Sequence, residues 1–230
     1  NSTWMYLESG NKAQYEPKLF AVDGMYQQDQ YGLGLSYLQI LDVKDSLHES
    51  ARDDLKNISL RANTQLNEAL HLSGEFVHQE QKHDNENAWY VRASYDFKQW
   101  PYQPSLSYRY SSFSEHYDPL FYGNTDAGFG TWFQGEVAAN YAGPFSSNTR
   151  IHQVALQASV QENLHVGAIA YQFDTIKKQH ESLDGHELDF FAVWSPQQNI
   201  NVIPLVGLYK PKKDVYHGGT QFADDKTNTY

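Results

Sequence analysis

YQPSLSYRYSSFSEHYDPLFYGNTDAGFGTWFQGEVAANY, residues 102–141, is the stretch that decides the fold. Its first part alternates strictly: Leu106, Tyr108 and Tyr110 share one parity, and the positions between them are small or polar, Arg109 among them. Successive side chains of a strand point to opposite faces of a sheet. Residues 106–111 are therefore predicted to form a strand with one apolar face and one polar face.

The second part of the stretch predicts a loop and then another strand. Residues 117–130 are rich in Gly and aromatic residues and do not alternate, whereas residues 132–141 do, with Trp132, Gln134 and Glu136 on one face. A face that carries Arg, Gln and Glu cannot enter a dry core without a large cost for each unpaired group. A wall with lipid outside and water inside suits both faces, so the stretch favours a membrane β-barrel.

The same alternation repeats along the chain, while helical periodicity is nearly absent; only residues 45–60 would allow a short loop helix. Most candidate strands hold roughly 9–11 residues, the length that a tilted strand needs to cross a bilayer. We therefore expect an all-β fold, a transmembrane, antiparallel, porin-like β-barrel with twelve or more strands, in one domain over residues 1–230. The other candidate strands are residues 3–8, 18–28, 31–41, 56–66, 69–79, 88–97, 150–160, 164–174, 186–194 and 200–209, and the uneven alternation of 164–174 suggests a bulge.

The connections between these strands fall into two classes. Short ones lie at residues 29–30, 67–68, 99–102, 161–163 and 196–199, and long polar ones at 42–55, 80–87, 114–130, 175–185 and 211–227. Short turns at one end and long loops at the other are typical of outer-membrane barrels. Counts from the two termini disagree by one crossing near residues 114–149. An extra strand near residues 118–122, or a loop that folds into the lumen and returns on the opposite side, would each explain this.

Composition excludes several classes of protein. The net charge of −11 argues against a nucleic-acid binder, and the absence of Cys excludes disulfides and thiolate metal sites. The mean hydropathy of −0.67 and the lack of a long apolar run give no sign of a membrane helix. The first residues lack a signal-peptide pattern, and residues 226–230 read as the start of a strand. Because a barrel in lipid must close, we expect this chain to be part of a larger barrel that has at least one more strand.

Charged side chains on the inward faces of the predicted strands are the candidate site. Arg61, Arg92 and Arg109 would attract or orient anionic groups, and Glu75, Asp96 and Glu136 would balance them. Glu187 and Asp189 are further inward acids, and residues 117–130 would form the constriction. Ion pairs that only hold the wall together are the competing interpretation. The predicted pore-lining or substrate-contacting residues are Arg61, Arg92, Arg109, Glu75, Asp96, Glu136, Gln134, Trp132, Asp118 and Tyr122.

Two catalytic alternatives have weaker support. The ten His residues match no compact ligand motif, so we expect no metal, and no motif indicates any other cofactor. Ser111, Ser112, Ser114, Glu115 and His116 lie close together in the sequence, as a lipid hydrolase might require, but no nucleophile elbow accompanies them.

Three segments together carry a resemblance to a known family. YRYSSFSEHYDPLFYG with GFGTWFQGEVAANY, then RIHQVALQASVQENLHVGAIAYQFD, then GHELDFFAVWSPQQNINVIPLVGLYKP, resemble the C-terminal half of the alginate-export family of outer-membrane β-barrels, over about residues 102–211. The resemblance implies a Gram-negative outer-membrane barrel with a polar lumen, an acidic polysaccharide or related solute as cargo, and no catalysis.

The expected function is therefore a non-enzymatic outer-membrane channel for a hydrophilic solute. The solute would be a carbohydrate, with an anionic polysaccharide such as alginate as one candidate. Expected partners are outer-membrane lipid, the polysaccharide or small sugar, and periplasmic export proteins, but no nucleic acid. Two alternatives stay open: an outer-membrane barrel enzyme acting on lipid, and a soluble β-sandwich carbohydrate-binding module.

Overall fold

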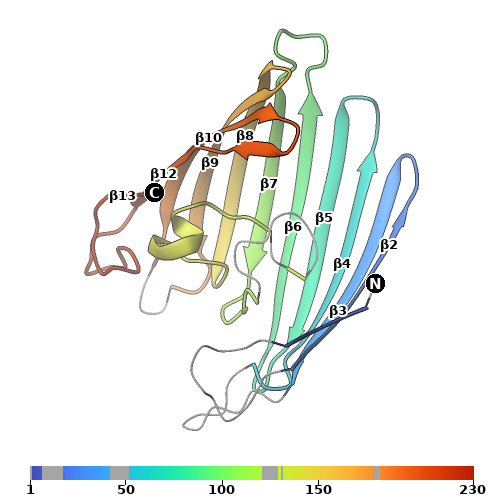
Figure 1. Ribbon diagram of the computed structural model, residues 1–230. Coiled ribbons are helices and arrows are strands. Elements are labelled where there is room, and N and C mark those ends of the chain that lie inside the picture. Colours follow the sequence, from blue (N-terminus) through green and yellow to red (C-terminus); the bar gives the residue numbers. More distant parts are fainter. Residues whose placement is uncertain (1, 7–17, 42–51, 121–128, 131, 179–181) are drawn as a thin grey trace.

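The computed structural model describes residues 2–6, 18–41, 52–120, 129–130, 132–178 and 182–230. Within these ranges thirteen strands form one antiparallel sheet, and helix is almost absent (Figure 1). The all-β, antiparallel prediction is confirmed. The strands are β1 (Ser2–Tyr6), β2 (Lys18–Gln27), β3 (Tyr31–Leu41), β4 (Lys56–Gln65), β5 (Leu70–Glu80), β6 (Asn85–Asp96), β7 (Ser105–Phe113), β8 (Thr149–Gln161), β9 (Leu164–Thr175), β10 (Gly185–Gln197), β11 (Ile200–Val202), β12 (Leu205–Pro211) and β13 (Asn228–Thr229).

The order of strands in the sheet follows the order in the chain. Each strand pairs with the next, except that β11 is a short partner of β10 beside the main row. The sheet curves strongly, so that one face is concave (Figure 1). It is not closed, because among the described residues β1 pairs only with β2 and β13 only with β12.

Short turns and long connections lie at opposite ends of this sheet, as the sequence predicts, with one correction: the long loop predicted at 80–87 is a tight turn of residues 81–84 between β5 and β6. The β2–β3, β4–β5, β6–β7 and β8–β9 turns share one end, at the top of Figure 1. We call this the short-turn end and the other the long-loop end. Residues 42–55, 114–148 and 212–227 connect strands at the long-loop end.

The predicted strand at residues 132–141 is wrong. Strands β7 and β8 pair directly, from Ser105 with Gln157 to Phe113 with Thr149, so residues 114–148 leave and return at the same end. Within them, Ala138–Ala142 form one turn of π-helix, η1. Instead of forming a strand, this segment bonds to the concave face mainly through its backbone, at the Phe133 carbonyl and the Val137 and Ala138 N–H groups. The unpaired crossing in the count disappears with this strand. Neither explanation from the sequence holds, because the described residues 118–120 form no strand and the segment returns at the end that it left.

Three smaller expectations also change. Residues 200–209 divide into β11 and β12 around Pro204, which has no N–H for the ladder. The irregularity expected in residues 164–174 falls on the partner strand, where the register shifts between Ser159 and Gln161. Of the possible helix at 45–60, residues 42–51 lie outside the described ranges, and β4 already begins at Lys56.

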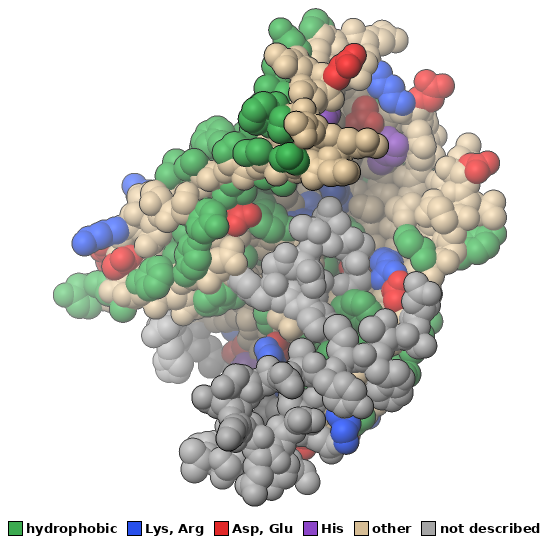
Figure 2. Space-filling view, viewed as in Figure 1, with side chains coloured by type: hydrophobic (Ala, Val, Ile, Leu, Met, Phe, Trp, Pro, Cys, Tyr) green, Lys and Arg blue, Asp and Glu red, His purple; other side chains and the backbone are tan. Residues whose placement is uncertain are grey.

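The outer, convex face of the sheet is largely apolar and the inner, concave face carries many polar side chains. This is the reverse of the arrangement in a water-soluble protein. Leu35, Leu60 and Val91, on β3, β4 and β6, are 58%, 57% and 55% exposed on the convex face. In Figure 2 hydrophobic side chains gather over the upper-left part, where Figure 1 places β8, β9, β10 and β12. On the concave face Ser36, Ser59 and many other polar side chains are buried. Apolar groups thus face outward and polar groups inward.

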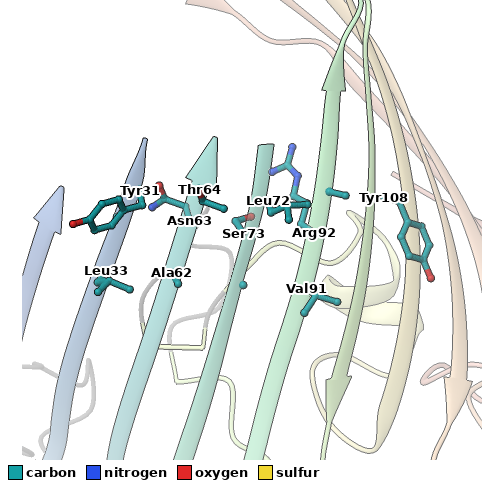
Figure 3. A pocket seen from close by; sticks show the side chains of 13 residues that line it. Tyr31, Leu33, Ala62, Asn63, Thr64, Leu72, Ser73, Val91, Arg92 and Tyr108 are labelled. Atoms are coloured by element: carbon teal, nitrogen blue, oxygen red, sulfur yellow. The ribbon is translucent and has the colours of Figure 1, made fainter. Parts of the chain in front are cut away.

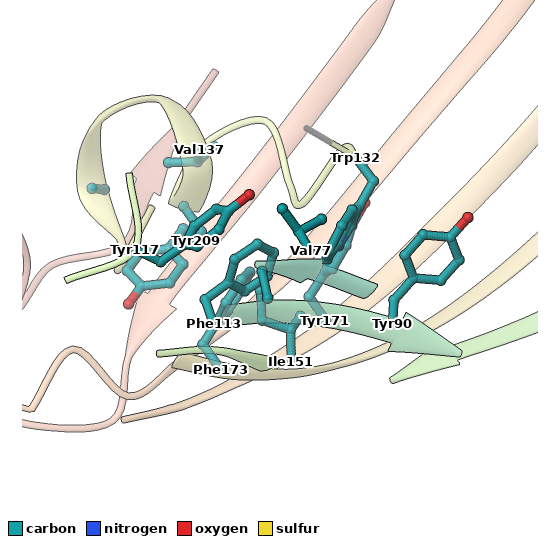
Figure 4. Close-up of a cluster of buried hydrophobic side chains, with 13 residues drawn as sticks. Val77, Tyr90, Phe113, Tyr117, Trp132, Val137, Ile151, Tyr171, Phe173 and Tyr209 are labelled. Atoms are coloured by element: carbon teal, nitrogen blue, oxygen red, sulfur yellow. The ribbon is translucent and has the colours of Figure 1, made fainter. Parts of the chain in front are cut away.

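Residues 114–148 pack against the concave face and create a core there. Trp132 and Val137 from this segment meet Phe113, Ile151 and Tyr171 from the wall (Figure 4). Trp132 lies 5.0 Å from Phe113 between ring centroids. This core occupies the concave side toward the long-loop end, so open space remains toward the short-turn end. In the described ranges no helix is long and apolar enough to cross a membrane.

Candidate functional site

Three arginines predicted from the sequence meet at one cavity on the concave face. Arg61 from β4, Arg92 from β6 and Arg109 from β7 line a space of about 220 Å³, together with Tyr90 and Trp132. Strand pairing explains the convergence, because Arg92 is the partner of Arg109 and Arg61 lies one inward row away on β4. We call this space the arginine cavity.

Arg61 is held in place by its neighbours on β2 and β3. Its Nη2 donates to Asp23 Oδ1 at 2.5 Å and its Nη1 donates to Ser36 Oγ at 2.6 Å. The side chain lies over Gly34, where an added Cβ would come within 2.5 Å of Arg61 Nε. Gly34 therefore leaves the room that the guanidinium occupies, and Asp23 balances its charge.

Arg109 connects the wall to the described part of residues 114–148, which we call the inward segment. Its Nη2 donates to the carbonyl of Phe133, and its guanidinium lies 5.8 Å from the centroid of the Tyr90 ring. Trp132 meets the same Tyr90 ring edge-on at 4.8 Å and donates its Nε1 to Ser111 Oγ at 3.2 Å. These contacts place two aromatic rings and a buried guanidinium side by side.

Arg92 differs from the other two arginines because it makes no hydrogen bond or ion pair with any other residue in the described ranges. It is half-buried and directly opposite Arg109. Two like charges at paired positions repel each other. The arginine cavity is therefore a place where an anion would relieve repulsion and accept hydrogen bonds from a guanidinium.

The predicted acid Glu75 does not line this cavity as an open charge. It is buried on β5, accepts a hydrogen bond from Ser59 Oγ, and accepts the Gly130 N–H at 3.0 Å. Its neighbour Gln79 exchanges hydrogen bonds with Asp118, donating to the carbonyl and accepting the N–H, both at 2.9 Å. These wall residues hold the inward segment.

The turn around η1 is held by two acids of β10. Glu187 Oε1 accepts the Val137 N–H at 2.8 Å and Oε2 accepts the Ala138 N–H at 2.6 Å. Asp189 Oδ2 accepts the Glu136 N–H at 3.3 Å. Successive backbone N–H groups at the start of a helical turn attract a carboxylate in this way. Burial and the nearby Asp189 raise the pKa of the Glu136 carboxyl.

A glycine makes this anchor possible. Gly135 has φ +107°, and a Cβ at this position would lie within 3.0 Å of the Glu187 carboxylate. The anchor was not predicted, because the sequence pattern treats Glu187 and Asp189 only as inward charges. The Gly135–Glu136 pair inside an otherwise alternating run was the signal that could have suggested a turn.

The remaining predicted site residues lie elsewhere. Asp96 is near the short-turn end, 3.2 Å from His71 Nε2. Asp118 accepts two hydrogen bonds from Arg52, at 2.5 and 2.7 Å, at the long-loop end. Gln134 donates to Ser146 Oγ at 2.9 Å inside the inward segment. Tyr122 lies outside the described residues.

The residues of the catalytic alternative have separate partners. Ser114 Oγ donates to the Asn87 carbonyl at 2.9 Å, and Glu115 pairs with Lys177 at 2.5 Å. His116 Nδ1 lies 3.6 Å from Glu86. Within the described ranges no group of three or more His, Asp or Glu residues is placed to hold a metal ion.

A larger hollow, of about 620 Å³, crosses β3 to β7 near the short-turn end (Figure 3). Its apolar lining includes Leu33, Leu72 and Val91 from the convex face, around the small residues Ala62 and Gly74. Arg92 borders this hollow as well as the arginine cavity. Small side chains such as Ala62 and Gly74 therefore line this hollow close to Arg92.

Comparison with known proteins adds no assignment: no protein-family model matches the chain, and a search of curated proteins finds no match.

Proposed function

We propose that this chain forms part of the wall of an outer-membrane channel that passes a hydrophilic carbohydrate, and we favour an anionic polysaccharide such as alginate as the solute. The main support for the proposal is the polarity of the two faces of the sheet, apolar on the convex side and polar on the concave side. An exposed apolar face that runs over consecutive strands suits lipid, and a buried polar concave face suits a water-filled lumen. Strands can cross a bilayer in this way only when the full wall is closed.

The arginine cavity supports the preference for an anionic solute. A guanidinium binds a carboxylate through two parallel N–H groups, and Arg92 has this capacity unused among the described residues. Tyr90 and Trp132 add apolar ring surface beside it. A sugar acid, which has both a carboxylate and C–H faces, matches this combination.

The inward segment supports a selective rather than an open pore. Residues 132–142 are held from the wall by Arg109, Glu187 and Asp189, and they border the arginine cavity through Trp132. In a closed barrel this cavity would border the path of the solute. The charge and size of the remaining space would set which solutes pass.

Single-channel conductance in a planar lipid bilayer tests the proposal. We expect steady conductance that an oligo-uronate blocks and a neutral oligosaccharide of the same length does not. Arg92→Gln should weaken the block by about tenfold, the effect of losing one charge-assisted contact of about 1.5 kcal/mol. Lys98→Gln, the same loss of charge in an exposed turn, is the matched control.

Two other results of the conductance measurement would change the proposal. Conductance that uronates leave unchanged would remove the anionic solute from the proposal and keep the channel. The absence of conductance in every lipid mixture would contradict the channel itself.

A further inference from the structure

Basic side chains gather on the convex face of β8, β10 and β12 at the long-loop end. Strand pairing sets His152 beside Gln172, Gln172 beside His186, and His186 beside Lys210. His152, His186 and Lys210 are exposed. This row spans three strand spacings, about 14 Å.

The next row toward the long loops adds two more basic groups. Arg150 is exposed and pairs with Asp174, whose Oδ1 accepts a hydrogen bond from Lys212 Nζ at 3.0 Å. One aspartate thus faces an arginine and a lysine. We call Arg150, His152, His186, Lys210 and Lys212 the basic patch. Its positive charge stands out on a chain whose net charge is −11.

The basic patch adjoins the apolar band of the convex face. The next row toward the short-turn end contains the exposed side chains Val154, Leu188 and Leu208. Tyr108, in the same row, shares a 2.8 Å hydrogen bond between its hydroxyl and His152 Nδ1. Aromatic side chains of this kind mark the boundary between the hydrocarbon and headgroup layers of a bilayer.

We propose that the basic patch binds the phosphate groups of lipids in the membrane leaflet at the long-loop end. The inference rests on the proposed function, because it needs the convex face to be covered by lipid. Phosphate oxygens accept hydrogen bonds from guanidinium and ammonium groups. The acyl chains of the same lipid lie along Val154, Leu188 and Leu208.

Native mass spectrometry of the detergent-solubilised protein tests this, with bisphosphorylated lipid A and its dephosphorylated form as probes. We expect the protein to retain the bisphosphorylated form and not the dephosphorylated one. Inorganic phosphate at the same phosphate concentration should not displace the lipid, because it lacks acyl chains. Equal retention of both lipids, or displacement by inorganic phosphate, would overturn the proposal.

Substitutions locate the binding to the patch. Lys210→Gln should weaken retention about fivefold, and Arg150→Gln with Lys210→Gln about 30-fold, at about 1 kcal/mol for each basic residue near a membrane surface. Lys98→Gln, in the exposed β6–β7 turn at the short-turn end, should have no effect. If Lys98→Gln weakens retention as much as Lys210→Gln, the binding is not at the patch and the inference is wrong.

Liposome flotation separates this inference from the proposed function. A protein that floats with liposomes but does not distinguish the two lipids contradicts the basic patch alone. A protein that does not float contradicts the membrane wall, and with it the inference.

Discussion

Arg92 and Arg109 are direct partners on neighbouring strands, with both side chains on the concave face. Only Arg109 has its guanidinium bound to the inward segment, through the Phe133 carbonyl. The pair thus divides two tasks: Arg109 holds structure, and Arg92 adds positive charge to the arginine cavity. This division separates stability from the solute binding that we propose, so each can be measured with its own variant.

Removing the charge of Arg92 and removing that of Arg109 should change the free energy of unfolding in opposite directions. Arg92→Gln should raise the free energy of unfolding by about 0.5 kcal/mol, because it removes a like-charge pair across two strands. Arg109→Gln should lower it by about 1–3 kcal/mol, because the Phe133 carbonyl and the Tyr90 ring lose their partner. Urea unfolding in detergent measures both. A loss of stability in Arg92→Gln as large as that in Arg109→Gln would refute the division.

Glu187→Gln should release the turn around η1. Both carboxylate oxygens accept backbone N–H groups, and an amide would present its own NH₂ to one of them. We expect a cost of about 2 kcal/mol and faster proteolysis within residues 132–148. Glu162→Gln, in the exposed β8–β9 turn, is the control. Equal proteolysis of both variants would show that Glu187 does not anchor this segment.

Gly135→Ala should disturb the same anchor from the other side. The backbone has φ +107°, and the new methyl group would press on the Glu187 carboxylate. We expect a loss of about 2–3 kcal/mol in the free energy of unfolding. Gly24→Ala is the control, because its Cβ would meet no atom closer than 3.9 Å. Stability equal to that of the Gly24 variant would argue against the described turn.

Leu60→Arg distinguishes a lipid-covered wall from a soluble sheet. Leu60 is 57% exposed in the middle of β4, opposite Leu35. In a bilayer midplane the arginine should cost about 2–4 kcal/mol. On a water-covered face the same change should stay within about 0.5 kcal/mol. Unfolding in lipid bilayers gives the measurement, and a near-zero change would show that water covers this face and would contradict the membrane wall.

Asp184 should make the β9–β10 connection sensitive to acid. Burial alone would raise the pKa of its carboxyl, but the Thr175 N–H and the Lys178 ammonium lower this pKa to about 2. The carboxylate therefore adds stability above its ordinary pKa of 3.8, and this stability is lost as the pH falls toward 2. In Asp184→Asn the free energy of unfolding should fall less steeply between pH 4 and pH 2 than in the unaltered protein. Thermal unfolding at a series of pH values measures this slope. An unchanged slope would contradict the assignment.

Much of the sheet could be predicted because alternation is a local signal. Most residues of β3, β4 and β7 report their face through their own polarity, and no distant contact is needed. Leu38, Ile40 and Phe113, near the long-loop end, are exceptions that pack as apolar groups on the concave face. Residues 132–141 also alternate, but what places them is remote in sequence: the Phe133 carbonyl bonds to Arg109 and the Val137 N–H bonds to Glu187. A local pattern cannot distinguish such a segment from a strand.

The site could be predicted in part for the same reason. The inward direction of Arg61, Arg92 and Arg109 follows from alternation, but their meeting at one cavity depends on the register of β4 to β7. That register is set by turn geometry, which single residues do not reveal. The commitment of Glu75 to Gly130 likewise depends on where residues 114–148 come to lie.

The direct pairing of β7 and β8 makes residues 114–148 a detachable module. The Asn148 N–H donates to the Ser114 carbonyl at 2.9 Å, so the two ends of the segment already meet as in a hairpin. A short turn could replace everything between them without changing the order of any strand. Selectivity in such a protein could therefore be exchanged by transplanting one continuous piece of chain, while the wall is inherited unchanged.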